Sequence, residues 1–290
     1  MKEVNEILKK YNIHGVRYKK EGKCIIIDDK YVIKPNKTNI YEYLNYRNFN
    51  NYPDITIEDS YEISEYIDEI EMPNEQKMID LITIISNLHK KTTYYKKISE
   101  FNIEEIYEDI KNKLDSIKIY YDNLMNEVES TIYMPPSYYL LARNVSFIYK
   151  MIEYSYNSLN KWKKNIENVD KIRVSIIHNN LKIEHLINDK LISWDNSKIS
   201  LPIFDLYKLY INTYNEYDWN ELLNIYFKNY PLKPEELLLF KILISIPLKL
   251  DFTNIEIDNV EEVNNKLDYL KLTYNFIFKD IDEINKKSEI

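Results

Sequence analysis

Two neighbouring stretches, IIHNNLKIEHLI at residues 176–187 and LISWD at residues 191–195, decide the fold of this chain. Apolar residues in each stretch predict short β-strands, and Asn188-Asp189 between them predicts a tight turn. The sequence on both sides has the apolar spacing of long amphipathic helices. Short strands and a polar loop inside a helical region are uncommon, so we expect functional loops here.

The first third of the chain alternates short apolar runs with turn residues, which indicates an antiparallel sheet. Glu21-Gly22 predicts a hairpin turn, and Thr38 or Asn39 is a candidate cap for a helix at 38–49. The predicted strands are residues 16–20, 23–28, 31–34, 55–58 and 61–67. We therefore expect a small lobe over residues 1–72, with about five strands and one helix.

From residue 73 to residue 290 the apolar residues step by three and four, which predicts a helical lobe. The predicted helices cover residues 74–89, 106–128, 141–162, 202–215, 218–229, 234–246 and 260–284. The stripe of the last helix, which includes Ile281 and Ile284, is typical of a coiled coil, but an isolated C-terminal helix more often packs on its own domain. The expected fold class is α+β, with a small antiparallel β N-lobe and a large helical C-lobe.

The composition narrows the class of protein. A net charge of -8 argues against a nucleic-acid or anionic-membrane partner, which would need a basic surface. The single Cys24 excludes an internal disulfide, and no apolar run of about 18 residues suits a membrane span. With no apolar signal segment near Met1, we expect a cytoplasmic protein. The 28 Tyr and 2 Gly indicate an AT-rich bacterial genome.

The motif at 176–195 resembles the catalytic and metal-binding segments of aminoglycoside phosphotransferases and choline-kinase-like proteins, whose patterns are His-Gly-Asp-Leu-x-x-x-Asn and Ile-Asp-Trp. The resemblance places Asn180 at that family's catalytic Asp, His185 at a metal-binding Asn and Ser193 at a metal-binding Asp. His178 matches the motif histidine that braces the loop. Asp205 matches a Pro-x-x-Asp-Leu segment with the same structural role. The order of motifs is similar to the spore-coat kinase-like branch of the protein-kinase-like fold.

The resemblance also implies a nucleotide site in the N-lobe. Lys34 matches the family's strand lysine, and Glu42 in the following helix is its natural ion-pair partner. The segment Glu65-Tyr66-Ile67 would hold adenine through backbone groups. A glycine-rich phosphate loop is absent, because Glu21-Gly22-Lys23 supplies one Gly only. The resemblance implies ATP as the cofactor, which intact relatives use to phosphorylate a hydroxyl group of a small molecule.

The replaced positions lack the chemistry of transfer. Asn180 cannot act as a carboxylate base, Ser193 offers a hydroxyl where Mg²⁺ prefers an anionic oxygen, and His185 offers a nitrogen. A zinc pair of His178 and His185 would need further ligands. Asp195, two residues beyond Ser193, is a candidate replacement ligand if the loop shifts. Asp is abundant elsewhere in the chain, so composition did not force these losses.

These residues support three hypotheses. The first is a pseudokinase that has lost most phosphoryl transfer, still binds nucleotide or a small ligand without a fitting Mg²⁺ site, and acts through an unidentified partner. The second is a divergent, active small-molecule kinase that uses Asp195. The third is a structural component of a spore-coat type. The acceptor pocket of this fold is built from variable helices, so the sequence does not predict the acceptor.

Overall fold

A computed structural model describes residues 9, 17–22, 24–37, 39–58, 60–98 and 102–280. It divides into two compact units. The N-terminal unit holds the described residues up to Ile84 together with His178–Lys198, and the helical unit holds Ile85–Ile177 and the described residues from Ile199 onward. The loops at 178–198 therefore group with the sheet. The lobe boundary expected at residue 73 stays a prediction.

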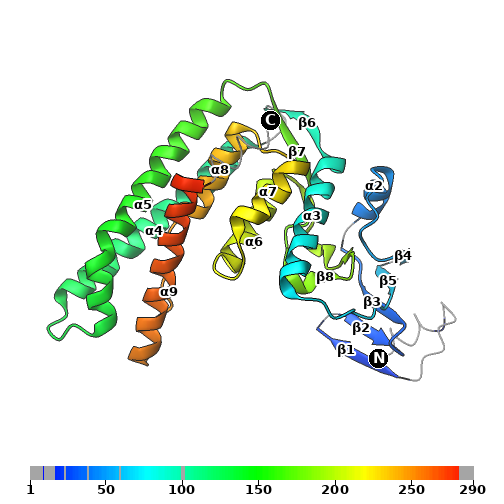
Figure 1. Cartoon of the computed structure of the whole chain (residues 1–290), viewed down its shortest axis with the longest axis horizontal. Coiled ribbons are helices and arrows are strands. Elements are labelled where there is room, and N and C mark those ends of the chain that lie inside the picture. Colours follow the sequence, from blue (N-terminus) through cyan, green and yellow to red (C-terminus); the bar gives the residue numbers. More distant parts are fainter. Residues whose placement is uncertain are drawn as a thin grey trace. The chain divides into compact units, whose positions relative to one another are not determined.

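The N-terminal unit is built on one five-stranded antiparallel sheet (Figure 1). Its strands, in sheet order, are β1 (Tyr18–Glu21), β2 (Cys24–Ile27), β3 (Tyr31–Pro35), β5 (Tyr61–Glu65) and β4 (Ile55–Glu58). The β1–β2 hairpin turns at Gly22, whose φ of 57° favours glycine. Asp28 and Asp29 take positive φ in the next turn, where Asp tolerates that conformation. The five predicted strands are confirmed, although Val16 and Lys23 lie outside the described residues.

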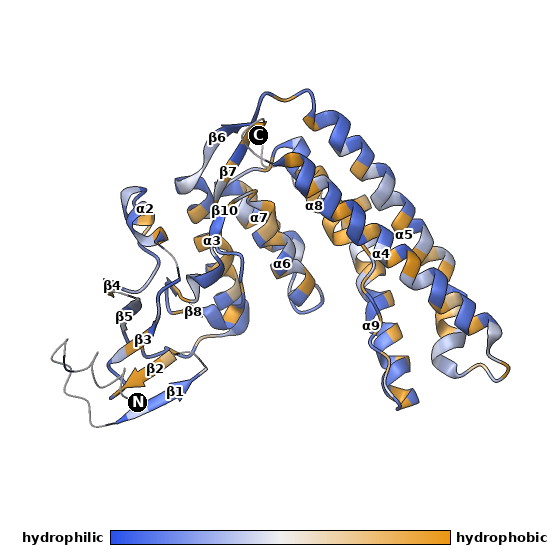
Figure 2. Ribbon diagram, turned by 180° about the vertical axis from the view of Figure 1, so that it is seen from behind, coloured by the Kyte–Doolittle hydropathy of each residue, from blue (hydrophilic) through white to orange (hydrophobic). Residues whose placement is uncertain are grey.

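The two faces of this sheet differ, because side chains alternate along each strand. Ile27, Ile33 and Ile63 share one face and form a small buried cluster. The opposite face carries Val32 and Lys34, with mixed polarity. Figure 2 shows β2 as hydrophobic beside a hydrophilic β1. The sheet thus uses one face for its core and leaves the other to line a pocket.

The helix of this unit, α2 (Ile40–Tyr46), is shorter than the predicted 38–49. Asn39 occupies the N-cap position but makes no side-chain cap bond, and Thr38 lies outside the described residues. The helix ends because Asn48 takes a φ of 55°, which α-helical backbone does not allow. Phe49 then turns inward, fully buried, with its ring edge against Trp194 at 6.0 Å.

Asparagine side chains fasten the loop segment 178–198 to the loops that precede β4 and follow β5. The segment contains the hairpin of β8 (Leu186–Ile187) and β9 (Lys190–Leu191), which turns at Asn188 with a φ of 55°. The Asn188 side chain accepts from Ile70 N–H at 2.9 Å and donates to Asp68 O at 3.1 Å. Asn51 bonds the hairpin twice, through its backbone to Leu191 and through its side chain to Asp189. These bonds hold the hairpin as one wall of the pocket.

The remaining residues form a helical unit with one small sheet. Its elements are the end of α3 (Asn74–Thr92), β6 (Tyr94–Lys97), α4 (Ile103–Ser130), α5 (Pro136–Ile166), β7 (Lys171–Ile177), β10 (Lys198–Ser200), α6 (Ile203–Thr213), α7 (Trp219–Asn229), α8 (Pro234–Ser245) and α9 (Glu256–Asn275). The sheet has the order β10-β7-β6, and β6 was not predicted. Figure 2 shows both hydrophilic and hydrophobic residues along α4 and α5, whose buried residues recur mostly every three or four positions, as on one face of an amphipathic helix.

The C-terminal helix packs on its own unit, as predicted. α9 contacts α5 and α8, and a π-helical turn, Phe276–Asp280, follows it. The helix begins at Glu256, four residues before the predicted start at residue 260. Ile281 and Ile284 lie outside the described residues. Within the described residues, no helix is both long enough and apolar enough to span a membrane.

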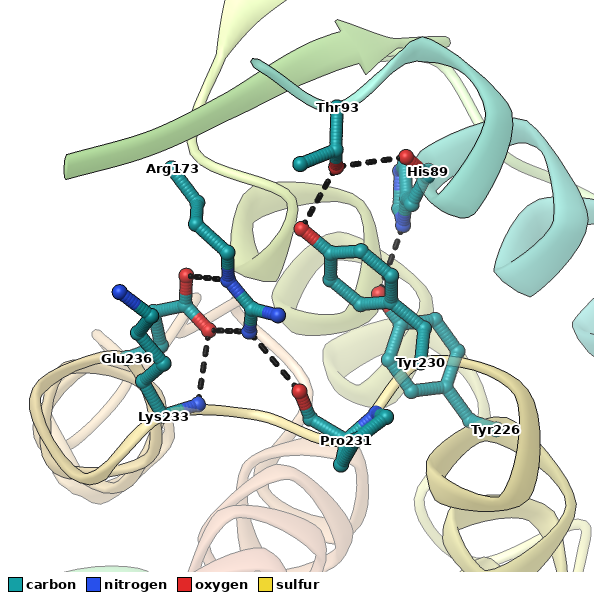
Figure 3. A network of polar contacts seen from close by, with 8 residues as sticks. All are labelled: His89, Thr93, Arg173, Tyr226, Tyr230, Pro231, Lys233 and Glu236. Carbon is teal, nitrogen blue, oxygen red and sulfur yellow. Dashed lines mark hydrogen bonds and ion pairs between the residues drawn. The ribbon is translucent and has the colours of Figure 1, made fainter. Parts of the chain in front are cut away.

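A buried polar network joins four elements of the helical unit (Figure 3). Arg173 of β7 donates from Nε to Glu236 of α8 at 2.9 Å and pairs with its second oxygen. The same guanidinium donates to Pro231 O at 2.8 Å and lies over the Tyr230 ring, 4.4 Å from its centroid. Thr93 links Tyr230 to the end of α3, because its hydroxyl bonds the Tyr230 hydroxyl and His89 O. This network ties β7 to α3, α7 and α8.

Candidate ligand pocket

The N-terminal unit contains a pocket of about 330 Å³. One wall is the face of the sheet that carries Val32 and Lys34. Cys24, Ile26, Val32 and Lys34 line this wall, and Ile26 and Val32 are cross-strand partners. The opposite wall comes from the loop segment 178–198. That wall is lined by Ile187, Ile192, Ser193, Trp194 and Asp195. A concave, mostly apolar cavity with a few polar groups is the usual form of a small-molecule site.

Lys34 sits at the polar end of the pocket, between two carboxylates. Its Nζ lies 3.1 Å from Glu62 Oε1 and 3.7 Å from Asp195 Oδ1. The side chain of Glu62 is 3% exposed, that of Lys34 14% and that of Asp195 31%. Glu62 faces Lys34 because the two residues are cross-strand partners in the β3–β5 register.

Tyr41 of α2 completes this cluster. Its hydroxyl donates to Glu62 Oε1 at 3.0 Å. Burial, followed by the nearby Glu62 carboxylate, raises the pKa of the Tyr41 phenol, so the group stays protonated and remains a donor. Oxygen Oε1 of Glu62 thus receives both the ammonium and the phenol, whereas Oε2 has no hydrogen-bond partner among the described residues.

The predicted ion pair between Lys34 and Glu42 is wrong. Glu42 is exposed on α2 and forms no ion pair with Lys34 in the described part of the chain. The preceding residue, Tyr41, occupies the buried side of the helix, and one residue along a helix is a rotation of about 100°. The sequence held a signal for Glu62, since it alternates with Ile63 in a predicted strand. The register of β3 against β5, which places Glu62 opposite Lys34, could not be predicted from the sequence.

The backbone at Glu65–Ile67 forms one edge of the pocket, where the base-binding segment was expected. Tyr66 N–H donates to Lys30 O at 2.8 Å, so this peptide faces β3. Successive residues in an antiparallel strand point their backbone groups to opposite sides. The groups of Glu65 therefore face the other way, beyond the last β4–β5 pair, Ile55 with Ser64. A ligand edge can meet them there.

The loop residues are held by backbone hydrogen bonds. His178 Nε2 donates to Ile192 O at 2.8 Å, and its ring packs edge-on against Trp194 at 4.9 Å. His185 Nδ1 donates to Asn180 O at 2.7 Å. This hydrogen bond links residues 180 and 185 of the loop. It also requires that Nδ1 of His185 carries a proton, because the carbonyl oxygen of Asn180 can only accept. Neither His185 nor Asn180 lines the pocket.

Ser193 and Asp195 both line the pocket because of the backbone conformation at residues 193–196. Ser193 takes a left-handed φ of 65°, and the 3₁₀ turn Trp194–Asn196 follows directly. The strand therefore ends before Ser193, and strand alternation does not govern Asp195. Trp194 turns inward and is fully buried, with its indole N–H bonded to Leu191 O at 2.8 Å.

Asp205 belongs to the helical unit and is fully buried on α6. Its Oδ2 lies 3.2 Å from His89 Nε2, and His89 Nδ1 lies 2.7 Å from the Tyr226 hydroxyl. Burial raises the pKa of Tyr226 well above its ordinary value. The phenol therefore donates to His89, which donates to Asp205. The role expected for Asp205 at the loop of residues 178–180 stays a prediction.

The two positions expected to bind Mg²⁺ hold poor ligands for it. Magnesium takes near-octahedral oxygen ligands at about 2.0–2.1 Å. The expected ligand positions hold an imidazole that donates to Asn180 and a serine hydroxyl. Across the described residues, no three or more His, Cys, Asp or Glu side chains are grouped to hold a metal ion.

The pocket is acidic. In the described part of the chain, the side chains that line it include five carboxylates and one ammonium. Two of these carboxylates, Glu21 and Glu69, have cations of their own in Lys19 and Lys77. Burial, opposed by the charge of Lys34, raises the pKa of the Cys24 thiol at the same wall.

Comparison with known proteins identifies the fold. No protein-family model matches the chain, and no curated protein matches it. An aminoglycoside phosphotransferase from Alicyclobacillus acidocaldarius superposes over 97% of this chain and 95% of its own, with a TM-score of 0.70 and 9% identity. The AMP-bound complex of a spectinomycin phosphotransferase matches over 100% of this chain and 99% of its own, with a TM-score of 0.53 and 12% identity. The chain therefore has the protein-kinase-like fold of the aminoglycoside phosphotransferases, as predicted.

Proposed function

We propose that this protein is a pseudokinase, which binds a nucleotide-like ligand in the pocket of its N-terminal unit and does not transfer phosphate. One observation carries the proposal. The pocket and Lys34 are retained, but the positions expected to carry the base and the metal ligands hold Asn180, His185 and Ser193. Fold alone does not establish an activity, so the proposal depends on this site and on the residues around it.

The chemistry of transfer supports the same reading. Phosphoryl transfer requires charge neutralisation by a cation and Mg²⁺, and a group that orients or deprotonates the acceptor. Asn180 carries no charge and cannot take a proton from a hydroxyl. Ser193 and His185 replace the two metal ligands expected from the resemblance. Together these replacements remove two requirements, the base and the metal site, so restoring one of them would leave the other unmet.

Ligand binding without turnover is the test. A thermal-shift titration with ATP, with and without Mg²⁺, measures binding because a ligand stabilises the native state by RT ln(1 + [L]/Kd). We expect a shift that does not require Mg²⁺ and is altered in Lys34→Ala. A matched control is Lys90→Ala, on an exposed lysine of α3. A shift that appears only with Mg²⁺, accompanied by ATP consumption, would overturn the proposal.

A divergent active kinase is the second candidate, and one observation favours it. Asp195 lines the pocket and its Oδ1 lies 3.7 Å from Lys34 Nζ, so a carboxylate stands beside the lysine that the resemblance assigns to phosphate binding. This candidate predicts Mg²⁺-dependent ATP turnover that Asp195→Asn abolishes. Absence of Mg²⁺-dependent turnover would rule it out, and turnover that survives Asp195→Asn would exclude the role of Asp195.

The setting of the protein is part of the proposal. The AT-rich composition supports a bacterial source, and the single, partly buried Cys24 supports a reducing compartment such as the cytoplasm. The acidic net charge supports a small molecule or a protein as partner rather than nucleic acid. A structural role in a spore coat rests only on the resemblance of the motifs. Fractionation of the source cells would test the location.

A further inference from the structure

One end of the helical unit displays apolar side chains to solvent. The connection between α4 and α5 lies there beside the start of α9 (Figure 1). Ser137 N–H donates to Glu256 Oε1 at 2.7 Å, and the rings of Tyr138 and Phe252 lie 5.8 Å apart. Isolated apolar residues are common on protein surfaces, whereas a group of them marks an interaction site. Six exposed residues of these segments form the distal patch: Ile132 (90% exposed), Tyr133 (91%), Met134, Tyr139, Ile255 and Ile257 (71%).

The connection that presents the patch is held by hydrogen bonds. α4 ends at Ser130, where Thr131 Oγ1 donates to Glu127 O at 2.8 Å, and α5 begins at Pro136 after a second proline. The Tyr138 hydroxyl donates to the Glu127 carboxylate at 2.6 Å, which ties the start of α5 to the end of α4. Because proline fixes φ and the bonds restrict the chain further, a partner would lose little free energy in ordering this connection.

The surroundings of the distal patch are acidic. Residues 127–139 carry two carboxylates and residues 251–262 carry five, and neither range contains Lys, Arg or His. Glu129 and Asp258 are exposed among them. Arg143 lies 5.6 Å from the centroid of one tyrosine ring of the patch and offsets a single charge. A complementary surface therefore has an apolar centre and basic residues around it.

Charge also distinguishes the candidate occupants of the patch. A second copy that met the same patch would bring the same carboxylates, and like charges across an interface cost affinity. An anionic lipid surface attracts basic segments, so an acidic rim disfavours it. A protein segment with an apolar face and Lys or Arg beside that face matches both the patch and its rim. An amphipathic helix is a common form of such a segment.

We propose that the distal patch docks a basic amphipathic segment of a partner protein. The apolar face of that segment covers Ile132, Tyr133 and Ile257, and its Lys and Arg side chains lie over Glu129 and Asp258. Tyrosine and methionine are enriched at protein interfaces, and the patch contains both. The proposal goes beyond the proposed function and does not depend on nucleotide binding in the pocket, so either can fail alone.

Fluorescence anisotropy with labelled peptides and the full chain tests the proposal. The probe is a peptide of leucine and lysine, about 18 residues or five helical turns long, with its leucines on one face. One control peptide has the same composition without that periodicity, and a second has glutamate in place of lysine. At about 0.15 M salt we expect the probe to bind at least about tenfold more tightly than either control peptide.

Variants of the chain locate the binding to the patch. Ile132→Ser with Tyr133→Ser should weaken probe binding about tenfold, and the exposure of both side chains spares the fold, which circular dichroism checks. The matched control is Ile119→Ser with Tyr95→Ser, an exposed pair elsewhere on the helical unit that should change binding less than about twofold.

A second pair of variants tests the acidic rim. Glu129→Lys with Asp258→Lys should also weaken probe binding about tenfold, because the basic side chains then meet like charge. Asp109→Lys with Glu153→Lys makes the same change of net charge at exposed positions of α4 and α5 outside the rim and should have less than about twofold effect.

The proposal is overturned if the probe does not bind, if it binds no better than its control peptides, or if the patch variants and their controls lose affinity equally. Sedimentation velocity of the chain and flotation with anionic vesicles test the other occupants. A dimer, or vesicle binding, that Ile132→Ser with Tyr133→Ser abolishes would assign the patch to a second copy or to lipid and also overturn the proposal. Each of these results leaves the proposed function standing.

Discussion

The coupling between Lys34 and Glu62 can be measured with a double-mutant cycle. At 3.1 Å and an effective dielectric constant of about 20, Coulomb's law gives an attraction of about 5 kcal/mol. Lys34→Met leaves Glu62 buried without a cation and beside Asp195, and should cost about 3–5 kcal/mol. Glu62→Gln keeps the shape and the bond from Tyr41, and Lys34 retains Asp195, so we expect a cost of about 2 kcal/mol.

The double variant should be more stable than Lys34→Met alone or close to it, because no buried charge remains without its partner. We expect a cost of about 3 kcal/mol for the pair, roughly 3 kcal/mol below the sum of the single costs. Urea unfolding followed by circular dichroism and tryptophan fluorescence supplies the free energies of unfolding. Costs that add to within about 0.5 kcal/mol would refute the claim that the two residues act as a pair.

Three further outcomes follow from the described contacts. Because burial raises the pKa of Cys24, its alkylation at about pH 8 should be slower in the native protein than in urea; the unfolded chain loses the thiol proton first, so stability should fall as pH rises above about 8.5. Equal native and unfolded alkylation rates would contradict this. Arg173→Met strands Glu236, which is 5% exposed, and should cost about 3–5 kcal/mol in urea unfolding, whereas a loss under about 1 kcal/mol would mean that the network in Figure 3 is not formed in solution. Tyr41→Phe removes one of two donors to Glu62 and should cost about 1 kcal/mol in the same assay, with no change in the β-sheet signal; a neutral effect would disprove the bond.

The sequence predicted the sheet and the helices because their signals are local. Alternation of apolar and polar residues determines which side chains of β2, β3 and β5 share a face, and turn residues determine where the strands end. The stripes of α4, α5 and α9 likewise follow from helical spacing. Strand β6 was missed because its sequence, YYKK, does not alternate apolar with polar residues, although exposure alternates along the strand in the structure.

The site was predicted less well, because its geometry depends on register and on two backbone conformations. Lys34 meets Glu62 only through the β3–β5 register, which a single sequence does not encode locally. Asp195 reaches the pocket because Ser193 is left-handed and a 3₁₀ turn follows. Ser has no strong preference for positive φ, so no residue in the motif announces this turn. Glycine or asparagine at that position would have done so.

The central claim is that the pocket is retained while phosphoryl transfer is lost, and ATP turnover tests it most directly. Phosphorus NMR of the purified protein with ATP and excess Mg²⁺ follows transfer to water or to a mixture of small hydroxyl compounds. We predict that ATP remains intact and that its loss does not exceed that in Lys34→Ala. Formation of ADP that requires Mg²⁺ and disappears in both Lys34→Ala and Asp195→Asn would contradict the claim.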